Sequence, residues 1–421
     1  MKQMEPTEQF IDHLFRQQAG KMVAVLSHLA GFKHLHLIED IVQESFISAF
    51  QQWKIKGIPE QPEAWLMKTA KNKAIDLLRR INYHARYVQS QQTKDYTEHV
   101  AQFFHEHEIS DSELRMIFAC CHPSLKTEDQ IALTLKLVFS FSIHEIARAL
   151  VLTEAVVQKR MNRAKSLLAN QSIPLEIPAG QALQDRMESV RTVLYLLFNE
   201  GYCSGKADEM IRKDLCVEAM RCTKIIAEHK AVADPANQAL LALMCLHASR
   251  FDSRSSNEHG IILLEEQNRD LWDRELMAVG FYYLNMASSG KTLTRYHLEA
   301  AIAAEHCKAS KYSDTNWQQL LQWYELLLRI DSSPVILLNR SLVIHAIGET
   351  EKAIQAILAI PGIDMLLNHD PQYSAVLGYL YMKHSDKIKA KDYLQKALAI
   401  TDSKAEKELL QARIDQLSIK N

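Results

Sequence analysis

The chain has 421 residues, of which 47 % are apolar and 24 % charged, and its formal net charge is −2. This composition is typical of a soluble globular protein, and the length leaves room for two to four domains that each bury a core. No run of about 18 apolar residues occurs, and the N-terminus has no apolar segment with a cleavage site. We therefore expect neither a membrane span nor an export signal. The 7 cysteines follow no framework spacing, which favours a reducing cytoplasm.

Glycine and proline are scarce, with 12 and 10 residues, and apolar residues recur with a period near 3.6 along most of the chain. We therefore predict an all-α fold. The charge is distributed unevenly along it. Residues 66–86 carry six basic side chains against one acidic, residues 131–170 carry six against two, and residues 91–130 carry three against eight. Two basic segments separated by an acidic one indicate two anion-binding surfaces joined by a linker.

The first predicted domain, residues 8–85, begins with a helix that has one apolar and one acidic face. In LIEDIVQESFISAFQQW the helical spacing predicts a buried stripe formed by Ile38, Ile41, Val42, Phe46, Ala49 and Phe50. The opposite, acidic face is formed by Glu39, Asp40, Gln43 and Glu44. Gly57, Pro59 and Pro62 then interrupt the pattern, so residues 54–62 are predicted to form a loop.

A second helix follows in EAWLMKTAKNKAIDLLRR, residues 63–80, with an apolar side and a basic side. Its polar side is formed by Lys68, Lys71, Asn72, Lys73, Arg79 and Arg80. Asp76 is expected to pair with Arg79 or Arg80. Trp53 and Trp65 flank the loop, where a tryptophan serves either as a core anchor or as a platform on which a base stacks. Core anchoring is the commoner role.

Residues 86–110 are polar and rich in glutamine, and we predict a linker that is helical in part. Residues 111–170 form the next predicted domain, whose first helix contains RMIFACCHPSL. Cys120, Cys121 and His122 could begin a metal site or provide a reactive thiol. No second ligand pair follows at the usual spacing and no base is evident. We therefore expect the two cysteines to be small buried core residues in a helix that ends at Pro123.

The segment SIHEIARALVLTEAVVQKRMNRAKSLLA predicts a helix, a tight turn and a second helix. Ser142 and Glu145 can form a capping box on the first helix, and Thr153 can cap the second. The second helix should bury Val157, Met161, Ala164 and Leu168 and expose Glu154, Gln158, Lys159, Arg163 and Lys165. This pattern is typical of a helix-turn-helix whose second helix enters the major groove of DNA.

Residues 171–421 are predicted to be helical again, with 28 basic and 32 acidic side chains. Two segments, 337–360 and 376–400, align at an offset of 37 residues with a similar order of small and large side chains. They include Gly348, Ala353, Ile357 and Ile360 in the first, and Gly378, Tyr381, Ala390, Leu394 and Ala397 in the second. This order resembles tetratricopeptide repeats, which stack into concave surfaces. The stretches FNEGY and LWDRE could line a pocket, but packing and capping roles are favoured.

The motif pair EDIVQESFISAFQQW and AWLMKTAKNKAIDLLRR resembles regions 2.2 to 2.4 of sigma-70-type factors, and ALTLKLVFSFSIHEIARALVLTEAVVQKRMNRAKSLL resembles their region 4. A chain with only these two regions is similar to the extracytoplasmic-function group. RTVLYLLFNEGY, DLCVEAMR and SPVILLNRSL further resemble the subgroup with a long tetratricopeptide-like C-terminal extension, and this likeness covers nearly the whole chain. The turn LVLT lacks the glycine usual in such motifs, so Val151 has to adopt a non-glycine turn geometry.

The resemblance implies an all-α sigma factor with region 2 at residues 8–85, region 4 at residues 111–170 and a helical-repeat domain at residues 171–421. It implies binding to core RNA polymerase and promoter-specific initiation of transcription in the bacterial cytoplasm, with no catalysis, metal or cofactor. The acidic face Glu39, Asp40, Gln43 and Glu44 would meet the basic β′ clamp helices, and region 4 the β flap.

The resemblance also implies two sets of promoter contacts. The −10 set is Trp53, Trp65, Lys68, Lys71, Asn72, Lys73, Arg79 and Arg80, and loop 54–62 would hold a flipped base. The −35 set is Thr153, Glu154, Gln158 and Lys159 near base edges, with Arg163 and Lys165 on phosphates. The C-terminal domain would regulate these activities in cis, or dock a protein or small-molecule regulator.

Three other classes compete with this interpretation. A helix-turn-helix regulator with a sensor domain, independent of polymerase, would leave the acidic helix and the tryptophan-flanked loop unexplained. A helical-repeat scaffold would leave both basic segments unexplained. An enzyme is the weakest alternative, because the sequence offers no glycine-rich phosphate loop, paired catalytic carboxylates or metal-ligand spacing.

Overall fold

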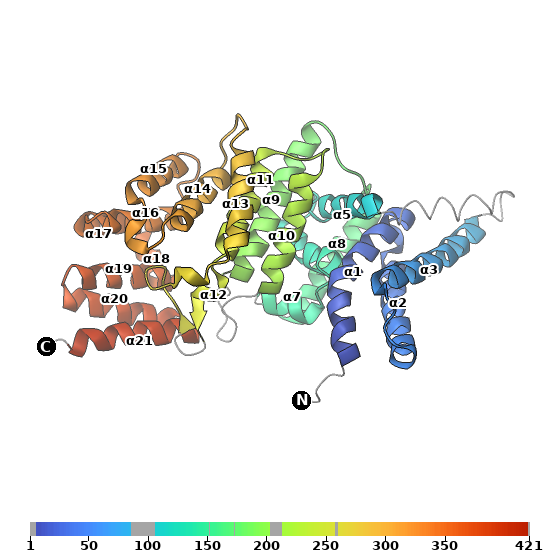
Figure 1. Cartoon of the computed structure of the whole chain (residues 1–421), viewed down its shortest axis with the longest axis horizontal. Helices are drawn as coiled ribbons and strands as arrows, with labels where there is room; N and C mark the ends of the chain where they lie inside the picture. The colour runs from blue at the N-terminus through green and yellow to red at the C-terminus, as the bar shows by residue number, and fades with distance from the viewer. Residues whose placement is uncertain are drawn as a thin grey trace. The chain divides into compact units, whose positions relative to one another are not determined.

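The computed structural model describes residues 6–85, 106–150, 152–171, 173–202, 213–256 and 260–419. The chain forms two compact units that divide between Val193 and Leu194, and helices dominate both (Figure 1). The predicted all-α fold is confirmed. In the described part, the strands are two-residue segments, β1 (Ser255–Ser256) and β2 (Gly260–Ile261), which pair antiparallel. None of the helices within these ranges is long and apolar enough to cross a membrane.

The first unit contains α1 (Pro6–Ala30), η1 (Phe32–His34), α2 (Leu35–Lys56), α3 (Pro62–Ala85), α5 (Glu106–Cys120), α6 (Thr127–Leu133), the π-helical turn η3 (Thr134–Val138), α7 (Ile143–Ala149), α8 (Glu154–Asn170) and the start of α9 (Gln181–Tyr202). The predicted linker lies outside the described residues up to residue 105, and its last residues begin α5. The division inside α9 places both predicted small domains in one unit. The individual domain ranges stay predictions.

The second unit contains the rest of α9 and then α10 (Lys213–Glu228), α11 (Pro235–Ala248), α12 (Phe251–Arg254), the two strands, η4 (Arg269–Leu271), α13 (Arg274–Ala287), α14 (Arg295–Lys308), η5 (Tyr312–Asp314), α15 (Trp317–Leu328), α16 (Pro334–Ala346), α17 (Thr350–Leu358), α18 (Ile363–His369), α19 (Pro371–Lys383), α20 (Lys387–Ile400) and α21 (Lys404–Ile419).

Helix α2 buries the stripe that its sequence predicts. Ile38, Ile41, Val42, Phe46 and Ala49 are buried, and Phe50 is half-buried. The predicted start of the following loop at residue 54 is wrong, because α2 continues to Lys56. The helix ends only at Gly57, whose φ of 82° is a value that side chains other than glycine rarely adopt. Pro62 then begins α3, at a position where its missing N–H costs no hydrogen bond.

The helix-turn-helix forms as its capping residues predict. The Ser142 hydroxyl accepts from the Glu145 backbone N–H at 3.1 Å, and the Glu145 carboxylate accepts from the Ser142 N–H at 2.8 Å, so the capping box is complete. The Thr153 hydroxyl caps α8. The four predicted core residues of α8 are at most 1 % exposed, namely Val157, Met161, Ala164 and Leu168. Val151 lies outside the described residues, so its turn geometry stays a prediction.

Helix α1 holds the first unit together. Residues 22–27 are all buried, because α1 packs against α2 and α3 on one side and against α5 and η3 on the other. The closest approach is at Gly20, where a Cβ atom would stand 2.2 Å from the Val138 carbonyl oxygen of η3. Only a residue without a side chain allows η3 to lie this close to α1.

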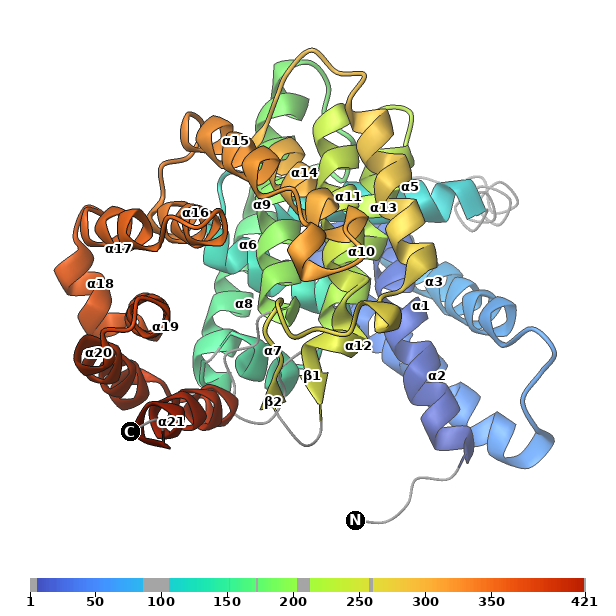
Figure 2. The same cartoon turned by 60° about the vertical axis from the view of Figure 1, so that its left-hand side comes forward.

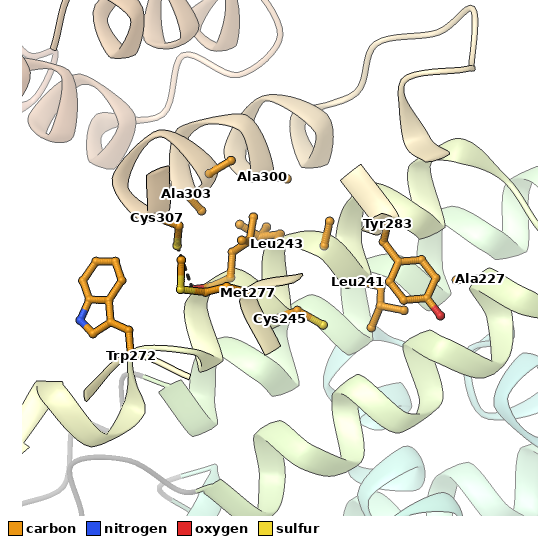
Figure 3. Packing of buried hydrophobic residues seen from close by; sticks show 13 residues of the cluster. Ala227, Leu241, Leu243, Cys245, Trp272, Met277, Tyr283, Ala300, Ala303 and Cys307 are labelled. Atoms are coloured by element: carbon orange, nitrogen blue, oxygen red, sulfur yellow. Dashed lines mark hydrogen bonds between the residues drawn. The ribbon is translucent and has the colours of Figure 1, made fainter. Parts of the chain in front are cut away.

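One hydrophobic cluster of the second unit is formed mainly by α10, α11, α13 and α14. Figure 3 shows its residues gathered between these helices, with Ala227 from α10, Leu241, Leu243 and Cys245 from α11, Met277 and Tyr283 from α13, and Ala300, Ala303 and Cys307 from α14. The Cys307 thiol lies 3.8 Å from the Leu246 carbonyl oxygen, which it can reach as a weak donor. The cluster is a closed hydrophobic core.

Helices α15 to α21 follow one another along a curved row (Figure 2). The two aligned segments form the helix pairs α16–α17 and α19–α20. A Cβ atom on Gly378 would meet Leu394 at 2.7 Å, so the small residue of α19 receives the large residue of α20. The small residues Ala353 of α17 and Ala390 and Ala397 of α20 are fully buried as well. The packing agrees with stacked helical hairpins, and the tetratricopeptide assignment stays a prediction.

Replacing Leu394 tests this packing. Leu394 is fully buried on α20, whereas Ile388 on the same helix is 85 % exposed. We expect Leu394→Ala to lower the stability of the second unit by about 2–5 kcal/mol, because a cavity is left in the helix pair. Ile388→Ala should cost less than about 0.5 kcal/mol. Urea unfolding followed by circular dichroism measures both, and equal midpoints for the two variants would contradict the described packing.

Candidate nucleic-acid interface

The predicted acidic face lies on α2, and two of its carboxylates are already paired. Asp40, Gln43 and Glu44 are exposed, whereas Glu39 is half-buried. The Glu44 carboxylate accepts from Lys73 of α3 at 2.6 Å. This bond joins the predicted polymerase surface to the predicted −10 surface. The charges of Glu44 and Lys73 therefore partly neutralise each other before any partner binds.

All the predicted −10 residues except Trp53 lie on α3. Lys68, Asn72 and Arg79 are exposed, and Lys71 and Lys73 are half-buried. The side chain of Arg80 lies outside the described residues. Asp76 pairs with Arg79 at 3.6 Å, as its sequence position predicts. Because both members of this pair are 64 % exposed, solvent screens it and the Arg79 guanidinium remains available to an anion.

The two tryptophans differ in accessibility. Trp53 is only 3 % exposed and packs against Phe10 and Trp65, with the two indole centroids 5.4 Å apart in an edge-to-face arrangement. Trp53 is therefore an anchor of the region 2 core in this structure. Trp65 is half-buried, so its ring is the more accessible platform for a base. Base stacking stays a prediction for both.

Two exposed apolar residues beside the loop were missed by the sequence analysis. Ile55, at the end of α2, is 85 % exposed, and Ile58 in the loop is 43 % exposed. Apolar side chains held in water next to a basic helix favour a contact with an unstacked base or with protein. The signal in the sequence was their position next to Gly57, where the helix ends: Ile55 lies two residues before it, and Ile58 lies between it and Pro59.

The predicted −35 residues lie along α8. Thr153, Glu154, Gln158 and Lys159 are exposed at its N-terminal half. The Glu154 carboxylate lies within hydrogen-bonding distance of His144 Nδ1, at 2.9 Å. The Gln158 side-chain amide donates a hydrogen bond to the Asn162 side-chain oxygen at 3.0 Å. These are exposed, local contacts that water or DNA can replace at little cost.

Arg163 has a structural partner that its sequence did not reveal. Its Nε donates to the Asp129 carboxylate of α6 at 3.0 Å, and its Nη2 donates to both oxygens of that carboxylate. Asp129 is 3 % exposed. The hydrogen bonds that the Arg163 guanidinium donates to Asp129 raise its pKa. If Arg163 contacted a phosphate, its guanidinium would have to serve both the phosphate and the buried Asp129 carboxylate. The phosphate contact stays a prediction.

The predicted exposure of Lys165 is wrong, because its side chain is half-buried against the predicted polymerase surface. Its ammonium donates to both carboxylate oxygens of Glu39 on α2, at 2.7 and 2.8 Å. A cavity of about 270 Å³ lies beside this pair, lined on the α2 side by His36, Glu39, Asp40 and Gln43 and on the other side by Lys136, Ile143, Gln158, Met161 and Lys165. Burial lowers the pKa of Lys136, and the neighbouring Lys165 lowers it further, while Glu39 opposes both.

The adjacent cysteines are buried, as predicted. Cys120 is the last residue of α5 and Cys121 follows it, and both are at most 1 % exposed. Burial raises the pKa of the Cys121 thiol to about 12, so the thiolate is scarce at neutral pH. Within the described ranges, no group of three His, Cys, Asp or Glu side chains is arranged to hold a metal.

The FNEGY and LWDRE stretches have packing and capping roles. Tyr202 is 7 % exposed and Trp272 is 2 % exposed. The Asp273 carboxylate accepts from the Leu276 N–H at 2.9 Å and caps α13. The guanidinium of Arg254 lies 3.6 Å from the centre of the Tyr202 ring. The favoured interpretation of these stretches is confirmed for these side chains.

Comparison with known proteins identifies two regions of the first unit and one that spans the division inside α9. Residues 14–82 match Sigma-70 region 2, residues 115–168 match Sigma-70, region 4, and residues 186–288 match a family of unknown function. The chain is 30 % identical over 393 residues to the uncharacterized protein R00370 of Rhizobium meliloti (strain 1021), covering 93 % of this chain and 92 % of that protein. No solved structure matches the chain.

The Arg163–Asp129 contact makes a prediction that needs no DNA. We expect Arg163→Ala to lower the urea midpoint of the first unit, because Asp129 would keep its buried charge and lose its cationic partner. Lys159→Ala, on the same helix and exposed, should leave the midpoint unchanged. Equal midpoints for both variants would show that Arg163 is available for DNA without cost to the fold.

Proposed function

We propose, from the premise that this chain belongs to the sigma-70-type factors, that it binds core RNA polymerase and directs promoter-specific transcription initiation. The observation that carries the proposal is the presence of region 2 and region 4 in one chain, in the order that the family uses. Each region has a surface of the charge that its role requires. The sigma family's general partners, polymerase core and promoter DNA, follow from this membership.

The proposed contact with polymerase is the acidic face of α2. Asp40, Gln43 and Glu44 are exposed and would meet the basic clamp helices of the β′ subunit, with Glu39 joining them once Lys165 is released. Complementary charge would speed encounter and fix the register of the two helices. Region 4 would contact the β flap. The sequence motifs support an assignment to the extracytoplasmic-function group within the family.

The proposed −10 contact is α3 with the preceding loop. Lys68, Lys71, Lys73 and Arg79 would neutralise phosphates and release counterions, which makes the affinity dependent on salt. The exposed Ile55 and Ile58 and the half-buried Trp65 would surround a base flipped from the non-template strand. Unstacking a base costs a few kcal/mol, which apolar and aromatic contacts offset.

The proposed −35 contact is α8 in the major groove. Thr153, Glu154, Gln158 and Lys159 lie at the N-terminal half of the helix, the part that reaches base edges in a helix-turn-helix. Glutamine recognises adenine and lysine recognises guanine through paired donor and acceptor groups. Lys165 would reach a phosphate only after it leaves Glu39.

We further propose that the C-terminal helical domain regulates regions 2 and 4 in cis, directly or through a protein or small molecule that docks on it. Support comes from its nearly balanced charge and from its helical hairpins, which together form a protein-binding platform rather than a DNA-binding one. The proposal assigns no catalysis, metal or cofactor to the chain and places its action in the cytoplasm, where the polymerase is.

Co-elution with bacterial core RNA polymerase on size exclusion at moderate salt tests the main proposal. We expect the wild-type chain to form a complex, and Asp40→Lys with Glu44→Lys to weaken it about tenfold through lost charge complementarity. The matched control is Glu128→Lys with Glu176→Lys, two exposed carboxylates of the first unit outside the proposed surfaces.

The outcomes separate the function classes. Weakening by the α2 reversal alone supports the sigma assignment and justifies a promoter search. Equal weakening by the control reversal would point to non-specific charge attraction. No complex under any condition would contradict polymerase binding and favour a helix-turn-helix regulator that acts on duplex DNA by itself.

Truncation tests the regulatory proposal. A chain ending after residue 202 keeps α9 complete and removes the helices from α10 onward. We expect core binding or promoter-dependent transcription to change by about fivefold or more, the size of a typical coupling between domains. If both activities matched those of the full chain, the C-terminal domain would have no regulatory role in these steps.

A further inference from the structure

Two stretches that the sequence analysis singled out, FNEGY and LWDRE, meet at a group of arginines in the second unit. Tyr202 ends the first stretch and Trp272 lies in the second. The Nη2 of Arg250 donates to the Tyr202 hydroxyl at 2.7 Å, and the Arg250 guanidinium lies 5.6 Å from the centre of the Trp272 ring. Arg250 therefore connects the two stretches.

Two further arginines lie on the same aromatic rings. The guanidinium of Arg254 lies 3.6 Å from the centre of the Tyr202 ring, and that of Arg269 lies 4.7 Å from the centre of the Trp272 ring. An aromatic face attracts a cation but does not neutralise its charge. Because arginine stays protonated in proteins, these three side chains, here called the arginine row, carry three positive charges.

The carboxylates near the arginine row are engaged elsewhere. Asp252 pairs with Lys213 at 2.6 Å, and Asp314 accepts from two serine hydroxyls at 2.9 and 3.1 Å. Burial lowers the pKa of Arg269, and the nearby Asp314 does not cancel that effect. Within the described ranges, no carboxylate forms an ion pair with any member of the row. Partly buried cations in such a group repel one another unless an anion joins them.

The inner end of the row holds buried donors that no described protein group uses. Arg269 is 6 % exposed, and its Nη1 donates to the carbonyl oxygens of His306 and Ala309 at 2.6 Å. Its Nη2 is buried and has no acceptor among the described residues, and the same is true of the Trp272 indole N–H. In Figure 3 the indole nitrogen lies on the side of Trp272 that faces away from the apolar cluster. An unused buried donor costs about 1–3 kcal/mol.

Two histidines beside the row respond to its charge. Burial, together with Arg250 and Arg269, lowers the pKa of His306 to about 3. Burial also holds the pKa of His247 well below its usual value, and Arg250 and Arg254 act in the same direction. Both imidazoles are therefore neutral at pH 7. The contribution of the arginines to both shifts indicates a positive local potential.

We propose that the arginine row binds a small oxyanion, the phosphate or carboxylate group of a small molecule. Water can accept from the neutral Trp272 N–H, but only an anion also compensates the three charges. The forked donors of arginine match the oxygens of both groups. Arg250 and Arg254 are half-buried, so an anion can reach them from solvent, while Arg269 supplies a donor from deeper in the fold.

The site lies wholly in the second unit, and its existence does not depend on the proposed sigma function. Its position in the C-terminal domain makes it the place where a small-molecule regulator of that domain would dock, and this role does rest on the proposed function. Failure of anion binding would leave the polymerase assignment intact. Failure of polymerase binding would leave the anion site intact.

Isothermal titration calorimetry of the full chain tests the site, with inorganic phosphate and citrate as separate probes at constant ionic strength. We expect saturable binding of one anion per chain with a dissociation constant below about 1 mM for at least one probe. The probe that binds identifies the group. Arg250→Gln and Arg254→Gln should each weaken binding at least about tenfold, because each removes a charge-assisted donor.

The matched control for these variants is Lys224→Gln. Lys224 lies on α10 with its side chain 61 % exposed, and the substitution removes the same charge outside the arginine row. We expect the affinity of this variant to equal that of wild type. Equal weakening by the control would show general charge attraction and overturn the site, and so would unchanged affinity in both arginine variants.

Hydrogen exchange of the wild-type chain locates the anion without any substitution, so the proposal is tested even if an arginine variant fails to fold. Saturating probe should slow exchange in peptides covering residues 247–254 and 267–273 and leave peptides from α16 to α21 unchanged. Protection confined to other segments would overturn the location. The absence of saturable binding of both probes by wild type would overturn the site itself.

Discussion

The first compact unit depends on the burial of residues 22–27 of helix α1. Residues 22–27 have no exposed face, since α2 and α3 cover one side and α5 and η3 the other. Removing either set of neighbouring helices would expose apolar side chains of α1 to water. Helix α1 therefore belongs to the cores of both regions. Gly20 adds the steric condition that lets η3 approach. The two sigma regions therefore share a core.

This shared core changes what the charged surfaces can do. The linear sequence suggests two independent anion-binding surfaces, but the fold brings Lys165 of one to Glu39 of the proposed polymerase-binding face and Lys73 of the other to Glu44. Each pair satisfies charges that partners would otherwise use. In the proposed function, binding of polymerase or DNA would exchange one set of ionic contacts for another.

In the second unit, some charged and aromatic polar side chains pair with one another or are buried within the fold. Arg295 pairs with Glu299 and Asp331 and lies over Tyr195, and burial lowers the pKa of His306 to about 3. Such groups stabilise packing and offer little reactive chemistry. The curved row of helices α15 to α21 would suit the docking role that is proposed for this domain.

The sequence by itself determined the helical class, the α2 stripe, the capping box of Ser142 with Glu145, the four core positions of α8 and the burial of the adjacent cysteines. These depend on neighbours within a few residues, so periodicity and capping chemistry were sufficient. Only the tertiary structure decided that Arg163 pairs with Asp129, that Trp53 is enclosed while Ile55 is exposed, and that Lys165 meets Glu39. Those partners lie far apart in the sequence, and which charged residues meet is set by how the helices pack around α1 and not by any local pattern.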